Sequence, residues 1–114
     1  MKSVGMMLIA FMFSVSIAYA CSDKVSNKAE HQTHIVEIKN FSFVPDEINV
    51  AQGDKVIWIN RDTINHNIVD SSTEVTLSQT LAKGDEFSYI VKENMNYACG
   101  FHPSMTGVVQ LRVQ

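Results

Sequence analysis

The sequence is poor in cysteine, with only Cys21 and Cys99 among its 114 residues. It contains no Cys-x-x-Cys pair and no Cys-x-x-Cys-His motif, which excludes a c-type haem attachment site and a cysteine-based metal finger. A disulfide between the two cysteines is open, although an exported domain of this size can fold without one. The residues beside Cys99 indicate a different role for that thiol.

Basic charge and helical periodicity are also scarce. Lys and Arg number 9 against 12 Asp and Glu, and the formal net charge is -3. Without Lys2, which lies in an N-terminal leader, 8 basic and 12 acidic residues give a charge of -4. This balance excludes a nucleic-acid binder, which would carry a basic stripe. No long stretch shows a helical period of apolar residues, so short β-strands are favoured.

Residues 1–20 have the pattern of an export signal. Lys2 supplies the positive start, an uncharged apolar run covers 4–17, and Ala18-Tyr19-Ala20 fits the small-x-small cleavage pattern. An uncleaved membrane anchor is the alternative, but a run of about 17 apolar or small residues is at the short limit for crossing a bilayer. We therefore expect a signal peptide that is cleaved and a mature protein in the periplasm.

The residue after this cleavage position is Cys21, which resembles the lipidated cysteine of bacterial lipoproteins. Ala18 and Tyr19 depart from that pattern, so a lipid anchor in the membrane and a chance cysteine both stay open. Residues 21–33 are mostly polar and are expected to form a flexible linker. His31 and His34 could hold a second metal, but no further ligand stands nearby, and we expect two solvated histidines.

Residues 34–114 are predicted to form one domain of short β-strands. Apolar and polar residues alternate in most segments, and turn residues recur about every 8 to 12 positions. The segment 56–59 is apolar on both faces, as a central strand is. Residues 70–82 fit a strand, a helical turn or a loop. The pattern predicts an antiparallel sandwich or barrel of seven or eight strands, within 35–39, 41–43, 48–50, 55–60, 66–69, 87–91, 97–99 and 107–113.

The segment Cys99-Gly100-Phe101-His102-Pro103-Ser104-Met105 places a thiolate, an imidazole and a thioether at i, i+3 and i+6. Taken singly, these are a buried thiol, a surface histidine and a methionine that fills a gap in the core. Taken together, they are three of the four ligands of a blue-copper centre, which has two His, one Cys and a weak axial Met. His66, which begins a predicted strand after a polar connection, is the candidate for the missing histidine.

These residues resemble the cupredoxins of the plastocyanin and amicyanin kind, from about residue 34 to 114. The two-residue gap between His102 and Met105 is most similar to amicyanin. The resemblance implies a Greek-key β-sandwich and one type 1 copper ion, held by His66, Cys99, His102 and, axially, Met105. The motifs that carry it are Phe41-Ser42-Phe43-Val44-Pro45, Ile48-Asn49-Val50, Gly53-Asp54, Val56-Ile57-Trp58-Ile59-Asn60, His66-Asn67, Tyr97-Ala98-Cys99 and the Cys-x-x-His-x-x-Met loop.

The resemblance also implies roles for residues around the metal. Asn67 is expected to hydrogen-bond toward the thiolate and to brace the ligand loop. Phe101 stands where amicyanin-like loops usually have proline, and its N–H is expected to contact the sulfur of Cys99 and to raise the reduction potential. Asn65 replaces a proline before the first ligand, and Glu93-Asn94-Met95 replaces a Gly-x-Tyr turn. These departures concern the loops and leave the ligand set intact.

The implied function is single-electron transport between periplasmic redox proteins, such as a c-type cytochrome or a periplasmic dehydrogenase, docking near His102. A periplasmic copper carrier or store is the alternative. A carrier is less favoured because Met95 and Met105 are the only methionines outside the leader. An enzyme is not expected, because Cys99 and His102 lack an orienting third group and the chain has no His-x-His pairs.

Overall fold

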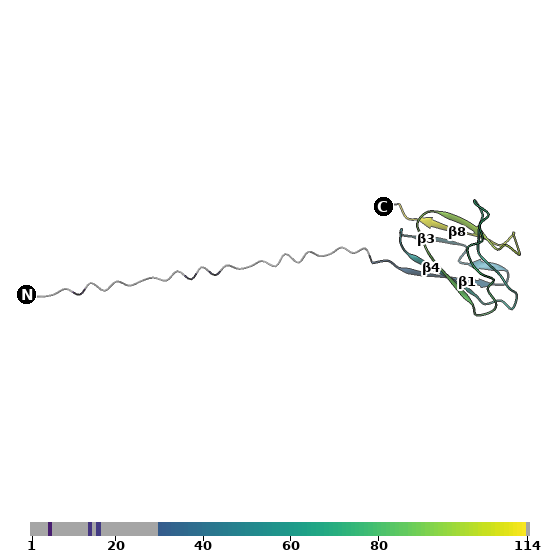
Figure 1. Cartoon of the computed structure of the whole chain (residues 1–114), viewed down its shortest axis with the longest axis horizontal. Coiled ribbons are helices and arrows are strands. Elements are labelled where there is room, and N and C mark those ends of the chain that lie inside the picture. Colours follow the sequence, from purple (N-terminus) through teal and green to yellow (C-terminus); the bar gives the residue numbers. More distant parts are fainter. Residues whose placement is uncertain (1–4, 6–13, 15, 17–29, 114) are drawn as a thin grey trace, which may run out of the picture.

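The computed structural model of the chain describes residues 5, 14, 16 and 30–113 (Figure 1). The expected cleavage site, Cys21 and the linker up to residue 29 lie outside the described residues, so the leader, the lipid anchor and the tether stay predictions. Within the described part, no helix has the length and apolar character needed to cross a membrane.

Eight strands form two sheets of four strands each. The first sheet has the order β2-β1-β4-β6, and the second has the order β3-β8-β7-β5. This architecture confirms the all-β sandwich and its predicted number of strands. The strands are β1 (Thr33–Lys39), β2 (Ser42–Val44), β3 (Glu47–Val50), β4 (Lys55–Asn60), β5 (Val69–Asp70), β6 (Glu86–Ile90), β7 (Met95–Ala98) and β8 (Thr106–Leu111).

The sheets are mixed, whereas the sequence pattern suggested antiparallel pairing throughout. β1 runs parallel to β4 and β3 runs parallel to β8, while the remaining pairs are antiparallel. The cause is that β2 and β3 belong to different sheets, so the chain crosses to the second sheet before it returns to place β4 beside β1. Alternation of apolar residues tells which face of a strand is buried, but not the direction of its neighbour.

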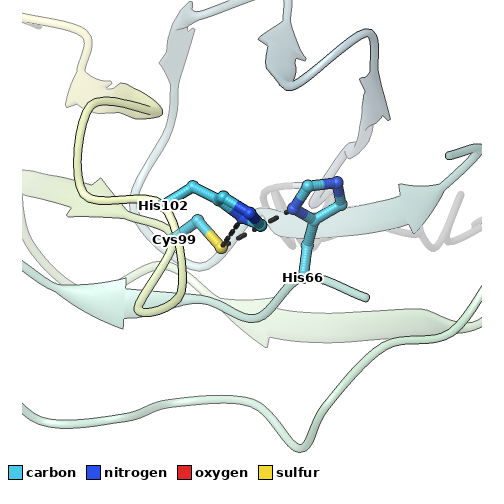
Figure 2. Close-up of side chains that lie close together, drawn as sticks. All are labelled: His66, Cys99 and His102. Atoms are coloured by element: carbon cyan, nitrogen blue, oxygen red, sulfur yellow. Dashed lines mark hydrogen bonds between the residues drawn. The ribbon is translucent and has the colours of Figure 1, made fainter. Parts of the chain in front are cut away.

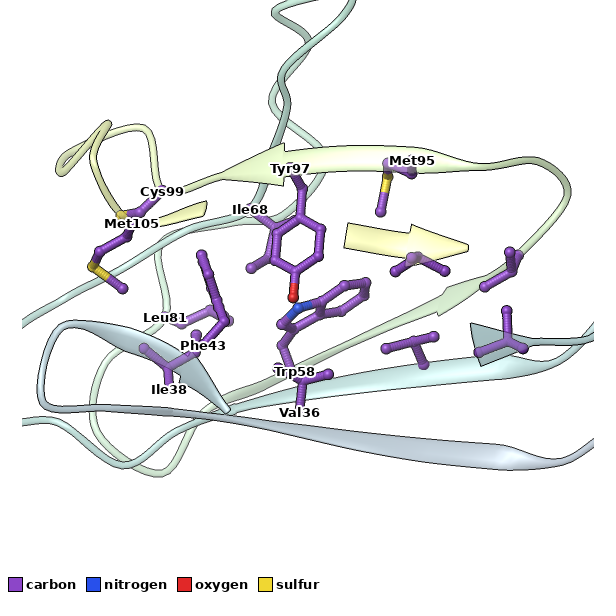
Figure 3. Packing of buried hydrophobic residues seen from close by; sticks show 14 residues of the cluster. Val36, Ile38, Phe43, Trp58, Ile68, Leu81, Met95, Tyr97, Cys99 and Met105 are labelled. Atoms are coloured by element: carbon purple, nitrogen blue, oxygen red, sulfur yellow. The ribbon is translucent and has the colours of Figure 1, made fainter. Parts of the chain in front are cut away.

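The core lies between the two sheets and is dominated by an aromatic cluster. Figure 3 shows the ring of Tyr97, from β7, pointing at Trp58, from β4, and the two ring centroids are 5.2 Å apart. Burying a large apolar side chain stabilises a fold by about 1.5–3 kcal/mol, so this cluster contributes much of the stability. The buried apolar residues are Val36, Ile38, Phe43, Val50, Val56, Trp58, Ile68, Leu81, Val91, Met95, Tyr97, Cys99, Met105 and Val109.

The hairpin between β1 and β2 places Phe41 outside this core. Lys39 pairs with Ser42, so Asn40 and Phe41 form a two-residue turn, with φ values of 52° and 56°. Successive positive φ values are those of a type I′ turn, whose twist matches that of the flanking strands. The strand predicted over 41–43 is therefore displaced by one residue, and β2 begins at Ser42. Phe43 is buried in β2, whereas Phe41 is 49% exposed at the tip of the hairpin.

The segment that the sequence left open, 70–82, is a loop after β5 that is tied back onto the fold. Val69 forms an isolated bridge with Thr76, and His66 forms one with Leu81. The second bridge consists of His66 N–H to Leu81 C=O at 3.1 Å and Leu81 N–H to His66 C=O at 2.7 Å. Because the side chain of Leu81 is fully buried, the loop anchors the backbone of His66 in the core.

The two linker histidines differ, and the expectation that both are solvated is wrong for His34. Its side chain is mostly buried in β1, and its Nε2 lies 2.9 Å from Oδ2 of Asp54. The buried carboxylate of Asp54 also accepts the amides of Gln32 and Ala51, at 2.9 Å and 3.0 Å. Asp54 thus holds the start of β1 against the turn before β4, a role that its turn-like sequence context did not reveal.

This contact makes the stability of the domain sensitive to acid. Burial raises the pKa of Asp54, but the hydrogen bonds from His34 and from the Gln32 and Ala51 amides outweigh it, and the pKa falls from 3.8 to about 2. A carboxyl group whose pKa is lower in the folded state stabilises the fold above its unfolded pKa, and this contribution is lost as the pH falls through the folded value. We expect the free energy of unfolding to decrease between pH 4 and pH 2, because the Asp54 carboxylate becomes protonated over this range.

Urea denaturation of the wild type and of Asp54→Asn across this pH range measures the effect. The variant should start less stable at pH 7, because an asparagine cannot accept all three hydrogen bonds, and its stability should fall less as the pH decreases. Asp46→Asn, at an exposed position before β3, is the control and should follow the wild type. Parallel pH profiles for Asp54→Asn and the wild type would contradict the assignment.

Candidate metal centre

The end of β7 places Cys99 in the core. Met95 and Tyr97 alternate as buried residues along this strand, and Cys99 continues the alternation with 1% of its surface exposed. The chain then turns back into β8, and the loop is closed by Cys99 N–H to Met105 C=O at 3.0 Å and Met105 N–H to His102 C=O at 2.9 Å. These two bonds fix the spacing between the three candidate ligands of the loop.

His66 reaches the same place from the connection between β4 and β5. The side chain of Asn60, at the end of β4, donates to the carbonyls of Ile64 and Leu81, at 2.9 Å and 2.8 Å. Asn60 is fully buried, so these bonds organise the connection from inside the protein. Together with the bridge to Leu81, they set His66 with none of its surface exposed.

The three side chains converge with their donor atoms facing one another (Figure 2). Cys99 Sγ lies 3.7 Å from His66 Nδ1 and 3.7 Å from His102 Nδ1. A metal that binds a thiolate at about 2.3 Å and an imidazole at about 2.0 Å, with an angle of about 120° between them, holds these donors about 3.7 Å apart. The three residues therefore fit a trigonal metal site. Among the described residues, they are the one cluster of three or more His, Cys, Asp or Glu side chains whose donor atoms lie close enough to share a metal ion.

The three candidate ligands differ in their access to solvent. Cys99 and His66 are buried, whereas His102 is only half-buried. A shallow groove of about 490 Å³ borders His102 and is lined by Thr63, Ile64, Asn65, Thr80 and Phe101. His102 is thus the candidate ligand through which the site meets the surface.

Met105 is buried next to this group. Its side chain is 4% exposed, and Figure 3 shows it with Cys99 at one end of the buried cluster. Its backbone bonds to Cys99 and His102 hold it next to both residues. The axial role of its sulfur stays a prediction.

Asn67 links the two segments that supply the ligands. Its Oδ1 accepts the amide of Gly100 at 2.6 Å and lies 3.8 Å from Cys99 Sγ. A Cβ atom on Gly100 would lie 2.9 Å from this oxygen, so the close approach requires glycine. The contact joins the start of the ligand loop to the residue after His66, which is what the predicted bracing requires.

Phe101 has its side chain on the surface, with 53% exposed. Within residues 30–113, its amide donates no hydrogen bond to Cys99 Sγ or to another protein group. This N–H is therefore free, in contrast to the neighbouring amide of Gly100. Its predicted effect on the sulfur stays a hypothesis.

Two neighbours of the site were missed by the sequence analysis. Asp62 Oδ2 lies 2.9 Å from His66 Nε2, and the ring of Phe41 stands edge-on to both imidazoles, with centroid distances of 5.6 Å to His66 and 5.1 Å to His102. Burial raises the pKa of Asp62, but hydrogen bonds from the Phe41 amide, His66 and the Asn40 amide outweigh it and lower that pKa. The sequence does contain a signal for the Asp62 contact, because Asp62 is an acidic residue four positions before His66.

Comparison with known proteins agrees with this geometry. The chain matches the family model of the cupredoxin-like domain over residues 5–110. A reduced amicyanin variant is 30% identical, with a TM-score of 0.64, over 70% of this chain and 82% of that chain. Another amicyanin variant, in its Cu(I) form, is 28% identical, with a TM-score of 0.65, over 70% and 82% of the two chains. No curated protein matches the chain at a significant level.

A further similarity concerns the fold alone. A copper-containing nitrite reductase from Thermus scotoductus SA-01 is 19% identical, with a TM-score of 0.64, over 72% of this chain but 23% of that chain. The sandwich is therefore shared with one part of a larger enzyme. The family match covers most of the sequence, and the chain belongs to the cupredoxin-like family.

Proposed function

We propose that this protein is a type 1 copper protein that carries single electrons by cycling between Cu(I) and Cu(II). The observation that carries the proposal is the equal 3.7 Å separation of Cys99 Sγ from the Nδ1 atoms of two histidines, with Cys99 and His66 buried. One thiolate and two imidazoles, with a weak methionine beside them, are the ligand set of such a centre.

Each candidate ligand would have its own role in binding the copper. Cys99 binds as the thiolate, and His66 and His102 bind as neutral imidazoles, so acid should weaken the site. Met105 would be a further, weak donor, and its identity would tune the potential. The copper supplies the exchangeable electron. The protein holds its donors in place through backbone bonds and the Asn67 contact to Gly100, which keeps the geometry nearly constant between oxidation states.

His102 is the proposed port for the electron, because it alone among the three ligands reaches the surface. Exposed apolar side chains surround it, namely Phe41, Ile64 and Phe101. A small apolar surface suits brief docking of a redox partner. We expect that partner to be a c-type cytochrome or a periplasmic dehydrogenase, reached after export of the chain, and tethered nearby if Cys21 is lipidated.

Catalytic turnover is not part of the proposal. Cys99 Sγ, His66 Nδ1 and His102 Nδ1 fill the strong positions of a trigonal site with protein atoms. Met105 would cover the axial side, so that a substrate has no strong position to occupy. The arrangement suits electron transfer, in which the geometry should change little.

Titration of the purified protein with Cu(II) tests the proposal. We expect an intense visible band that saturates at one copper per chain, bleaches with a reductant and returns on reoxidation. Voltammetry should show a fast, reversible one-electron wave. A colourless copper complex would overturn the proposal, and rapid loss of copper to a chelator without a reversible wave would favour a copper carrier.

Phe101→Pro tests the hypothesis that the free amide of Phe101 raises the potential. Proline removes the N–H, and hydrogen bonds to the thiolate are among the factors that set the potential. If the amide turns to the sulfur when copper binds, and the new bond favours the reduced state by about 1 kcal/mol, removing it lowers the potential by about 40 mV. Phe101→Ala keeps the N–H and is the matched control. Equal potentials for wild type and Phe101→Pro would end the hypothesis.

A further inference from the structure

One carboxylate joins the metal site to the tip of the β1–β2 hairpin. Oδ2 of Asp62 lies 2.9 Å from His66 Nε2 and accepts the amide of Phe41 at 3.0 Å. Oδ1 accepts the amide of Asn40 at 2.7 Å. Asp62 is itself held by the fold, because its N–H donates to Oδ1 of the fully buried Asn60 at 2.9 Å.

The carboxylate determines which nitrogen of His66 carries the proton. An ionised carboxylate only accepts hydrogen bonds, so Nε2 must be the N–H that faces Asp62. In a neutral imidazole the other nitrogen, Nδ1, then has its lone pair free. Figure 2 shows that Nδ1 is the nitrogen turned toward Cys99, with the second nitrogen pointing away. The tautomer that Asp62 requires is therefore the one that can bind a metal.

The same carboxylate supports a strained turn. Asn40 and Phe41 both have positive φ values, 52° and 56°, a conformation that residues other than glycine adopt when the surroundings enforce it. Their two amides converge on the two oxygens of Asp62. The turn held in this way carries the ring of Phe41 over both His66 and His102.

We propose that Asp62 is a positioning residue that fixes the tautomer of His66 and the covering ring of Phe41 as one unit. It acts on the metal only through these two residues. The proposal rests on the proposed function in taking His66 as a ligand. Its first test uses metal-free protein, so it can succeed or fail independently of copper.

The chain contains its own matched control. Asp54 accepts two backbone amides and contacts a histidine Nε2, as Asp62 does. Its partner His34 lies near the start of β1, whereas the hairpin follows the end of that strand. The two carboxylates thus make the same kinds of contact at opposite ends of β1, and only Asp62 contacts a metal-site residue.

The test measures hydrogen exchange by NMR in the metal-free protein, and then Zn(II) affinity as a colourless probe of the site. In Asp62→Ala, the amides of Asn40 and Phe41 and the Nε2–H of His66 should all exchange at least about tenfold faster. Zn(II) affinity should fall by about 10- to 100-fold. In Asp54→Asn, these exchange rates and the affinity should stay at the wild-type values.

Asp62→Asn gives a second, milder test that does not require the alanine variant to fold. Asparagine keeps one accepting oxygen. In the place of Oδ2, this oxygen accepts from the Phe41 amide and from His66 Nε2–H. In the place of Oδ1, it accepts from the Asn40 amide alone. We expect the first arrangement, so that the Asn40 amide alone loses protection while Phe41 and His66 keep theirs. Unchanged protection of all three groups, or an equal loss of Zn(II) affinity in Asp54→Asn, would overturn the proposal.

Discussion

Cu(II) added to the Cys99→Ser variant should give no intense visible band. That band arises from charge transfer between a thiolate and copper, and serine offers only a hydroxyl group in its place. The substitution is nearly isosteric, and the new hydroxyl at this buried position costs the fold about 1–3 kcal/mol. A folded but colourless variant, followed by optical titration and circular dichroism, is therefore the expected result.

Cys21→Ser is the control, because Cys21 is the other cysteine of the chain. It should leave the position and the intensity of the band unchanged. A band that persists in Cys99→Ser and disappears in Cys21→Ser would place the thiolate outside the domain and overturn the site. Loss of the band in both variants would indicate that Cys21 and Cys99 both take part in the metal site, which would contradict the three-residue cluster.

Gly107→Ala should destabilise the domain strongly. Gly107 pairs with Tyr97 across β7 and β8, and the tyrosine ring lies over it. A Cβ atom on Gly107 would overlap with Cζ of Tyr97. The ring has little room to move, because it packs against Phe43 and Trp58, with centroids at 4.7 Å and 5.2 Å. Overpacking of this kind costs about 3 kcal/mol or more, which urea denaturation would measure.

The double variant Gly107→Ala with Tyr97→Ala separates this clash from a general effect of losing glycine. With the ring removed, the added methyl group should cost little, so the two substitutions should show strong favourable coupling. Gly84→Ala is a second control, since a Cβ there meets nothing within 4 Å. Its cost of about 1 kcal/mol should come from the positive φ alone. A Gly107→Ala variant as stable as the wild type would contradict the packing.

The candidate ligands could be selected from the sequence because most of the information is local. Cys99, His102 and Met105 lie within one short loop, and alternation along β7 placed Cys99 on the same face as Tyr97. His66 could be added because few histidines were available. Alternation also predicted the sandwich, since each strand buries one face.

The contacts that orient the site could not be predicted in the same way. Asp62 and the tip of the hairpin are about twenty residues apart, as are His34 and Asp54, and no spacing rule connects them. The parallel pairs β1–β4 and β3–β8 depend on how the chain passes between sheets. Phe41 was misplaced because an aromatic residue at spacing two from Phe43 resembles a strand, whereas its turn geometry depends on long-range hydrogen bonds.

The pairing of Ala98 with Thr106 is the last rung of the β7–β8 ladder, and the ligand loop lies wholly beyond it. Lengthening a loop is inexpensive, since each doubling of its length costs only about 0.6 kcal/mol in closure entropy. Insertions between Cys99 and Met105 would leave the strand register unchanged. Evolution, or an engineer, could therefore change the proposed copper site and its surroundings while the rest of the domain stays under separate selection for stability.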